Sequence, residues 1–192
     1  MRHPKTSTHP RILLFLTLVG IMLLVGAGAG ISLAEQVVAG DVFPAQEITK
    51  EMGCVTCGMY PASYPQWQQQ IVFKDKTAAA FDGGKCLFRY LLNMAKLDAT
   101  HTPADIAMVW VKDFNTGAWL DGTKATYVVG STVMGPMGKE IIPFADQTAA
   151  NAFQQKNGGS VEPYGNITMD TITPLMGGMM HKHHGGPAMK MP

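Results

Sequence analysis

Net charge is nearly absent from this 192-residue sequence, in which 15 Lys and Arg stand against 14 Asp and Glu. The formal net charge is therefore only +1. A protein that binds nucleic acid needs a basic face that neutralises phosphates. Because nothing in the sequence resembles such a face, we exclude nucleic acid as a partner.

The amino terminus has the layout of an export signal. Basic residues precede an uninterrupted apolar run over 12–25, and a Gly/Ala-rich stretch follows that ends at Ala34. The small residues before Glu35 favour cleavage there, whereas an uncleaved anchor is the alternative because the apolar stretch is just long enough to span a bilayer. No cysteine lies at this point, so we expect no lipid attachment. In either case the rest of the chain is expected to face an oxidising, periplasmic or otherwise extracytoplasmic compartment.

Cysteine is scarce, and the three present are Cys54, Cys57 and Cys86. An odd number in an exported protein leaves at least one thiol that is free, bound to metal or paired between chains. Methionine, with 14 residues, is unusually common. Methionine often fills cores, but several lie close to the carboxyl terminus, where we expect no core.

Hydrophobic periodicity predicts an α+β fold of two similar ββαβ units with small antiparallel sheets. In the first unit, 35–118, we expect strands at 70–73, 77–81 and 106–114 and a helix over 82–97 capped by Asp82. In the second unit, 119–168, we expect strands at 125–131, 140–144 and 160–162 and a helix over 146–156 capped by Asp146. Each unit places Phe and Asp where the second strand meets the helix, which indicates an internal duplication.

Apolar spacing also predicts the buried face of each helix. In the first helix the stripe is Leu87, Leu91 and Met94, and in the second it is Ala149, Ala152 and Phe153. The Asn-Gly-Gly sequence at 157–159 is expected to end the second helix, since glycine accepts the left-handed conformation.

The last segment, 169–192, is predicted to be a disordered Met/His-rich tail. Pro174, paired glycines and a mixture of Met, His and Lys offer too little apolar surface to fold alone. Its six methionines are Met169, Met176, Met179, Met180, Met189 and Met191.

The sequence Cys54-Val55-Thr56-Cys57-Gly58-Met59 concentrates the chemistry, because two cysteines at this spacing can direct both sulfurs at one point. The spacing serves zinc sites, copper sites and redox disulfides alike. A thioredoxin-type disulfide needs a helix after the second cysteine, and the glycine and prolines that follow it break helices instead. Structural zinc needs four ligands, and only Cys86 and a histidine near the carboxyl terminus are left to complete a set.

Monovalent copper fits these ligands best, because it is soft and accepts thiolate and thioether donors. Cys54, Cys57 and Met59 supply three sulfurs within six residues. A second pair, Met134 and Met137, lies in a Gly/Pro-rich turn, for which an ordinary hairpin connection is the alternative interpretation. The tail adds further candidate ligands for copper in either oxidation state. They are Met179, Met180, His181, His183 and His184.

The chain resembles the NosL family of nitrous oxide reductase accessory proteins over about 53–164. The resemblance is carried by the CxxCGM sequence at 54–59, the Phe-Asp-Gly turn at 81–83 and the Met-Gly-Pro-Met-Gly block at 134–138. It implies an exported copper(I) chaperone, not an enzyme, that serves nitrous oxide reductase together with membrane assembly factors. It also implies two ββαβ units related to part of organomercurial lyase. The matching ligand positions are Cys54, Cys57, Met59, Met134 and Met137.

The sequence departs from that family in three ways. It lacks the lipoprotein cysteine with which many members begin, it carries Cys86 at the expected helix start, and it extends into the Met/His-rich tail. Cys86 is included among the candidate ligands, although a small buried residue is the commoner role of a free cysteine.

Two other classes of function stay open at this point. One is an enzyme, either a thiol-disulfide oxidoreductase or a carbon–mercury lyase with Asp82 as its acid, and the other is a zinc-stabilised binding module.

Overall fold

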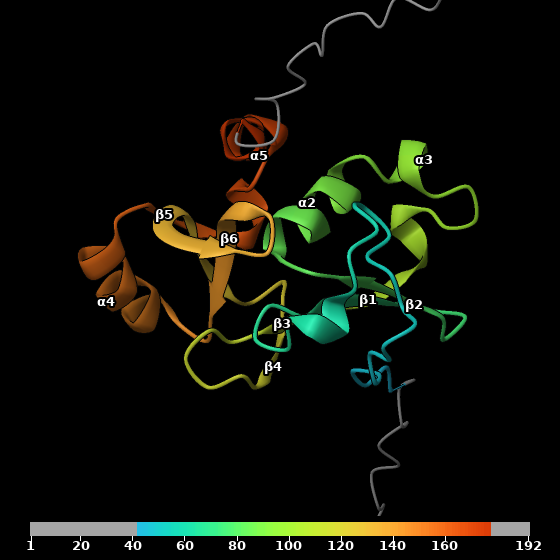
Figure 1. Cartoon of the computed structure of the whole chain (residues 1–192). Coiled ribbons are helices and arrows are strands. Elements are labelled where there is room, and N and C mark those ends of the chain that lie inside the picture. Colours follow the sequence, from blue (N-terminus) through green and yellow to red (C-terminus); the bar gives the residue numbers. More distant parts are fainter. Residues whose placement is uncertain (1–41, 178–192) are drawn as a thin grey trace, which may run out of the picture. The chain divides into compact units, whose positions relative to one another are not determined.

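Two small antiparallel sheets carry the fold (Figure 1). The computed structural model describes residues 42–177. The first sheet has strand order β2-β1-β3-β4, and the second has order β6-β5-β7. The strands are β1 (Gln69–Phe73), β2 (Ala78–Phe81), β3 (Ile106–Lys112), β4 (Trp119–Asp121), β5 (Thr126–Gly135), β6 (Gly138–Phe144) and β7 (Ser160–Pro163).

Along the chain, two helices come between β2 and β3, one comes between β6 and β7, and one follows β7. They are α2 (Gly84–Leu92), α3 (Met94–Leu97), α4 (Gln147–Asn157) and α5 (Met169–Met176), with 3-10 turns η1 (Pro61–Ser63), η2 (Pro103–Asp105) and η3 (Tyr164–Asn166). Within residues 42–177, none of these helices has the length and apolar character needed to cross a membrane. The predicted export segment lies outside the described residues.

The two sheets repeat one topology, which confirms the predicted pair of ββαβ units. In the first sheet β1 is central and pairs with β2 on one side and with β3, the strand after the helices, on the other. In the second sheet β5 is central and pairs with β6 on one side and with β7, the strand after α4, on the other. All of these pairings are antiparallel, as predicted.

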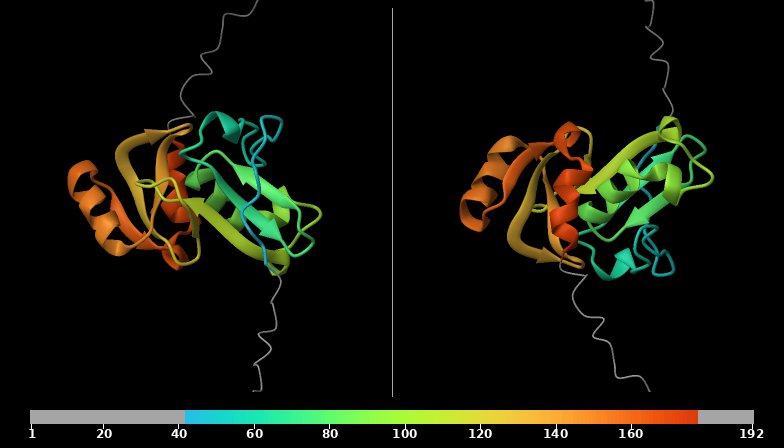
Figure 2. Two further views of the ribbon diagram at one scale, coloured as in Figure 1. Left: turned by 90° about the horizontal axis from the view of Figure 1, so that it is seen from below. Right: turned by 90° about the horizontal axis from the view of Figure 1, so that it is seen from above.

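The predicted boundary between the units, at 118/119, cuts through the first sheet. The short strand β4 was not predicted, and it pairs with β3 so that Leu120 lies opposite Val111. The units also share one apolar core, to which Ile71 of the first sheet and Tyr127 and Ile141 of the second contribute fully buried side chains. In Figure 2 α5, drawn in red, runs between the two sheets in both views.

The helix predicted over 82–97 is interrupted at Asn93, which separates α2 from α3. Asp82 does not cap it, because the N-cap residue is Gly83, which has no side chain of its own to accept a hydrogen bond. The predicted apolar stripe is correct: Leu87 and Met94 are buried in the core, and the partly buried Leu91 packs against that core. The prediction for α2 therefore found the buried face but misplaced the helix start.

The second helix, α4, follows the prediction at both ends. The Asp146 side chain accepts a hydrogen bond of 2.9 Å from the Ala149 backbone N–H, and Gly158 ends the helix with a φ of 69°. The buried alanine is Ala150 rather than Ala152, which is exposed. Ala150 lies three residues before Phe153, so the two share one face of the helix.

The prediction that the chain is disordered from residue 169 onward is wrong, because Met169–Met176 forms α5. The prediction overlooked a pair of apolar residues at helical spacing, Ile172 and Leu175, whose side chains are buried in the shared core. A capping box at Thr168 starts the helix. Met169 and Met176 pack against the core, so they serve as core residues. The tail ligands from Met179 onward lie outside the described residues.

A histidine joins the β1–β2 turn to the segment after α3. The His101 ring lies 3.0 Å from Asp98 through Nδ1 and 3.2 Å from Asp75 through Nε2, and it stacks on Phe73 with centroids 3.8 Å apart. The hydrogen bond to Asp98, and then the one to Asp75, raise the pKa of His101. The histidine therefore binds its proton more tightly in the folded protein than in the unfolded chain.

This arrangement predicts a pH-dependent loss of stability in His101→Gln. A raised histidine pKa stabilises the fold fully below the unfolded pKa of about 6.5, and the contribution is lost as the pH rises through the folded pKa. Urea unfolding of parent and variant should therefore differ most on the acidic side of that value and least in alkaline buffer. If parent and variant differed equally in unfolding free energy in acidic and in alkaline buffer, the histidine would contribute packing alone.

Candidate metal centre

The CxxC segment is a tight loop closed by its own backbone. The Cys54 N–H donates to the Met59 carbonyl at 2.6 Å, and the Gly58 N–H donates to the Cys54 carbonyl at 2.8 Å. Gly58 sits at a φ of 78°, which glycine adopts without strain. The Val55 N–H bonds to Ala80 of β2 at 3.2 Å, so the loop is fixed to the first sheet.

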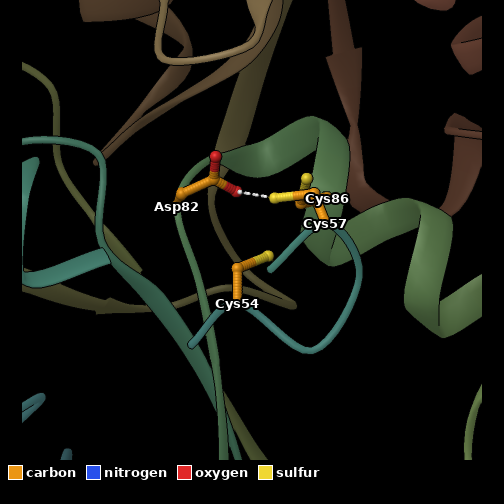
Figure 3. A group of neighbouring side chains, drawn as sticks. All are labelled: Cys54, Cys57, Asp82 and Cys86. Atoms are coloured by element: carbon orange, nitrogen blue, oxygen red, sulfur yellow. Dashed lines mark hydrogen bonds between the residues drawn. The ribbon is translucent and has the colours of Figure 1, made fainter. Parts of the chain in front are cut away.

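Three thiols and one carboxylate converge beside this loop (Figure 3). One ligand atom each from Cys54, Cys57, Asp82 and Cys86 lies within 4.8 Å of all the others. The Cys57 thiol donates to Asp82 Oδ1 at 3.4 Å. Two of the thiols, Cys54 and Cys86, are buried, whereas Cys57 is half-buried. The cluster is therefore open to solvent mainly on the side of Cys57.

The junction of β2 and α2 supplies the other two donors. Asp82 directly follows β2, and Cys86 is the third residue of α2, so both lie near the positive end of the helix dipole. The Thr56 hydroxyl donates to the Cys86 carbonyl at 2.9 Å, which joins the CxxC loop to the helix. This contact places the loop cysteines opposite the helix start.

The second unit holds the start of α2 in place. A side chain at Gly84 would lie 2.1 Å from the Ile141 carbonyl oxygen of β6, so glycine is needed for this close approach. Glu140, also on β6, accepts a hydrogen bond of 3.0 Å from the Lys85 backbone N–H. The carboxylate of one unit thus accepts a hydrogen bond from the first turn of the cysteine-bearing helix of the other.

Electrostatics allow only one thiol of the cluster to ionise easily. A hydrogen bond from the Cys86 thiol lowers the pKa of Cys54 to about 7, against the opposing effects of burial and the Asp82 charge. Burial raises the pKa of Cys57 to about 12. The hydrogen bond to Cys54, together with burial, raises the pKa of Cys86 far above its ordinary value. Without a cation the site therefore keeps protons on two thiols.

A bound cation can replace these protons. Asp82 Oδ2 is buried without a hydrogen-bond partner in the structure, an arrangement that costs free energy unless a ligand supplies one. Metal ions bind deprotonated cysteine, so a metal entering the cluster would displace the thiol protons and compensate the buried negative charge. The donor set is soft, which suits copper(I) and also zinc.

Met59 lines the same hollow as Cys57, the accessible thiol of the cluster. Cys57, Met59, Tyr60 and Tyr64 are among the residues that line a hollow of about 360 Å³. No charged side chain contributes to that hollow. A partner's ligand can therefore approach Cys57 through an uncharged opening.

The other predicted methionines line a different hollow. Met134 belongs to β5 and pairs with Lys139 of β6, so it is part of a regular strand, contrary to expectation. Pro136 and Met137 form the turn between these strands. Met134 and Met137 border this second hollow together with α5. Met134 and Met137 thus line a different hollow from the one beside Cys57.

Sequence reasoning missed two residues of the site. The sequence analysis interpreted Asp82 as a helix cap or a catalytic acid. Asp82 also follows a buried strand and lies four residues before Cys86, a spacing that suits a pair of ligands at a helix start. Glu140 carried no local signal, because its role depends on contact between two units. Cys86 is both a buried residue and a member of the cluster.

The hydrogen bond between Cys86 and Cys54 predicts a thiolate titration. In reduced protein stripped of metal, one thiolate should form with a midpoint near pH 7, visible in ultraviolet absorbance. Cys86→Ala should move this midpoint upward because it removes the largest cause of the lowered pKa. Cys54→Ser should abolish the signal, and its persistence would assign the thiolate to another cysteine.

The close approach at Gly84 predicts that Gly84→Ala destabilises the fold. The new methyl group must displace β6 or α2, and such overpacking costs about 1–3 kcal/mol or more. Gly165→Ala is the matched control, since a side chain there meets open space. Urea unfolding should show a lower midpoint for Gly84→Ala only; equal midpoints for the two variants would contradict the packing argument.

The chain is similar to known proteins. The NosL family model matches residues 44–172. A copper-binding lipoprotein NosL from Stutzerimonas stutzeri is 30% identical over 135 residues, which cover 68% of this chain and 70% of that protein. Another from Achromobacter cycloclastes is 29% identical over 159 residues, which cover 77% and 79%. The crystal structure of the copper chaperone NosL from Shewanella denitrificans superposes with a TM-score of 0.59 at 25% identity, covering 68% of this chain and 99% of that one. The match to the family model and these relatives show that the chain belongs to the NosL family.

Proposed function

We propose that this protein is an exported metallochaperone that binds copper(I) at the cysteine cluster and delivers it to a copper enzyme outside the cytoplasm. The observation that carries the proposal is the convergence of Cys54, Cys57 and Cys86 with Asp82 within 4.8 Å. Two relatives are named copper-binding lipoproteins and a third a copper chaperone, which supports copper as the cargo.

The donor types favour the monovalent ion. Copper(I) prefers thiolates and thioethers at low coordination number. The cluster offers three sulfurs, and Met59 lines the neighbouring hollow with Cys57. In this proposal the thiols hold the ion and Met59 assists its entry or exit.

The uneven burial of the cluster supports a carrier. Cys54 and Cys86 are 3% and 4% exposed, so they shield the ion from water, while Cys57 is the accessible thiol. An incoming ligand can replace donors one at a time from the side of Cys57. Stepwise exchange of this kind allows release to a partner without the ion passing through solvent.

Zinc is the second candidate, because three thiolates and a carboxylate also suit a tetrahedral ion. Disulfide exchange is less well supported: the CxxC loop leads into Pro61–Ser63, a 3-10 turn, and the helix amino terminus carries Cys86 instead. A thiolate stabilised for exchange normally sits where the helix begins.

The client we propose is nitrous oxide reductase, with its membrane assembly factors as further partners. The basis is family membership together with the export-type sequence before Glu35. The same sequence supports a periplasmic location, either in soluble form after cleavage or anchored through the amino-terminal segment.

Copper(I) titration tests the cluster. The mature chain, 35–192, should bind copper(I) tightly under anaerobic conditions in competition with a chromophoric chelator. Cys54→Ser/Cys57→Ser should weaken this binding more than about 100-fold, or about 2.8 kcal/mol, because two of the three sulfurs are lost. Thr148→Ala, an exposed change on α4, is the control.

Two results would count against the proposal. Unchanged affinity in the double variant would remove the cysteines from the site. A clear preference for zinc over copper(I), with no transfer of copper to metal-free nitrous oxide reductase, would favour the zinc module instead.

A further inference from the structure

The three thiols of the cluster are close enough to react with one another (Figure 3). Their sulfur atoms lie within 4.8 Å of each other. A disulfide bond is about 2.05 Å long, so two of these sulfurs need to approach by at most about 2.8 Å to form one. The cluster can therefore hold a disulfide as an alternative to a metal.

Exposure decides which thiol another molecule meets first. Cys54 and Cys86 are 3% and 4% exposed. Cys57 is half-buried and lines the uncharged hollow of about 360 Å³. Thiol–disulfide exchange needs direct contact between the attacking and the attacked sulfur. Exchange between this cluster and another molecule therefore begins at Cys57.

Two features favour Cys54 as the partner of Cys57. These two cysteines share one loop, whereas Cys86 lies on α2, whose start is held from the second unit by Glu140. The Cys86 thiol also donates a hydrogen bond to Cys54, so Cys54 is the sulfur of that pair with thiolate character. Because the thiolate is the nucleophile in exchange, a bond between Cys54 and Cys57 is favoured and Cys86 stays a thiol.

We propose that Cys54 and Cys57 form a disulfide in the metal-free protein, and that a partner protein with a reactive dithiol reduces it through Cys57 before copper(I) binds. This inference rests on the proposed function for the cargo and for the oxidising compartment. The protein is here a substrate of thiol–disulfide exchange, not a catalyst of it. The partner is defined by its chemistry, that of a dithiol protein of the thioredoxin type.

Closure of the bond takes two exchange steps with a disulfide R–S–S–R as the oxidant. The Cys57 thiol gives up its proton and attacks this disulfide, so that a mixed disulfide forms and one R–SH is released. The Cys54 thiolate then attacks the Cys57 sulfur and displaces the second R–S⁻, which takes up the proton that Cys54 has lost. Two electrons have then passed from the chain to the oxidant.

Reopening of the bond runs in the opposite direction. A thiolate of the dithiol partner attacks the Cys57 sulfur, and Cys54 leaves as a thiolate. The second thiol of the partner then attacks its own half of the mixed disulfide, which frees Cys57 and leaves the disulfide in the partner. The two electrons come from the partner, and the cluster regains the sulfur donors that copper(I) needs.

The disulfide and the metal exclude each other, because metals bind cysteine as the thiolate and a disulfide sulfur carries no charge. With the bond closed, the cluster keeps one thiol, Cys86, beside Asp82. Copper(I) affinity should therefore fall about 100-fold or more, as it does when the same two sulfurs are lost by mutation. Bound copper(I) should in turn protect the two cysteines from oxidation.

Disulfide mapping tests whether the bond forms. The metal-free mature chain is treated with glutathione disulfide, its remaining thiols are alkylated, and it is digested with trypsin. The peptide 51–74 holds both Cys54 and Cys57, and the peptide 86–89 holds Cys86. We expect an internal disulfide in the first peptide and an alkylated thiol in the second. A disulfide that joins the two peptides, or three alkylated thiols, would overturn the inference.

Copper binding and reduction are then measured on the oxidised chain after the reagents have been removed. Its affinity for copper(I), in competition with a chromophoric chelator, should be about 100-fold or more below that of the reduced chain. Reduced thioredoxin, used as the dithiol probe, should restore it. A thioredoxin variant without its second active-site cysteine should be trapped in a mixed disulfide at Cys57. Equal affinities of the two forms, or trapping at another cysteine, would contradict the mechanism.

Two single variants check the order of the steps. Cys57→Ser should keep its two buried thiols in glutathione disulfide at least about ten times longer than the parent keeps Cys54 and Cys57, because exchange has lost its point of entry. Cys86→Ser should still form the internal disulfide. Loss of thiols from Cys57→Ser as fast as from the parent would show that the buried thiols react directly, against the proposed order.

Failure of this inference differs from failure of the proposed function. If the reduced chain does not bind copper(I) tightly, the proposed function is wrong whichever disulfide forms. If the reduced chain binds copper(I) tightly and no bond forms between Cys54 and Cys57, the disulfide alone is disproved.

Discussion

The site depends on the contact between β6 and the amino terminus of α2. A methyl carbon added at Gly84 would lie 2.1 Å from the Ile141 carbonyl oxygen, so only glycine permits this close approach. Through this contact Glu140 caps the helix from the opposite unit. The helix start in turn positions Cys86 opposite the CxxC loop. The four residues of the cluster all belong to the first unit, and the second unit holds the helix that bears Cys86.

Unfavourable burial of negative charge explains why the cluster suits a cation. The thiols and the carboxylate lie within 4.8 Å of one another, and burial raises the pKa of Cys57 to about 12. Protons occupy the cluster at neutral pH because several negative charges cannot share a buried space. A soft cation removes the same repulsion while forming bonds with the sulfurs. In the proposed function, protons and copper(I) therefore compete for one set of atoms, which suits a site that takes up and releases its metal.

Much of the fold followed from local sequence patterns, whereas the site followed only in part. The six predicted strands, the Asp146 cap and the glycine end of α4 follow from local features, and the structure has each of them, with strand ends shifted by a few residues. β4 was missed because its three residues carry no periodicity. α5 was missed because its stability comes from burying Ile172 and Leu175 against distant strands. The cysteine pair was evident from its spacing, but Asp82 and Glu140 gain their roles from contacts across the chain.

The central claim is that sulfur from Cys54, Cys57 and Cys86 forms the first coordination shell of copper(I). X-ray absorption at the copper edge, on the mature chain loaded with one equivalent, measures this shell directly. The account predicts the edge of a monovalent ion and a low-coordinate shell dominated by sulfur. In Cys86→Ser the shell should contain fewer sulfurs. A shell dominated by nitrogen or oxygen, or one unchanged by Cys86→Ser, would contradict it.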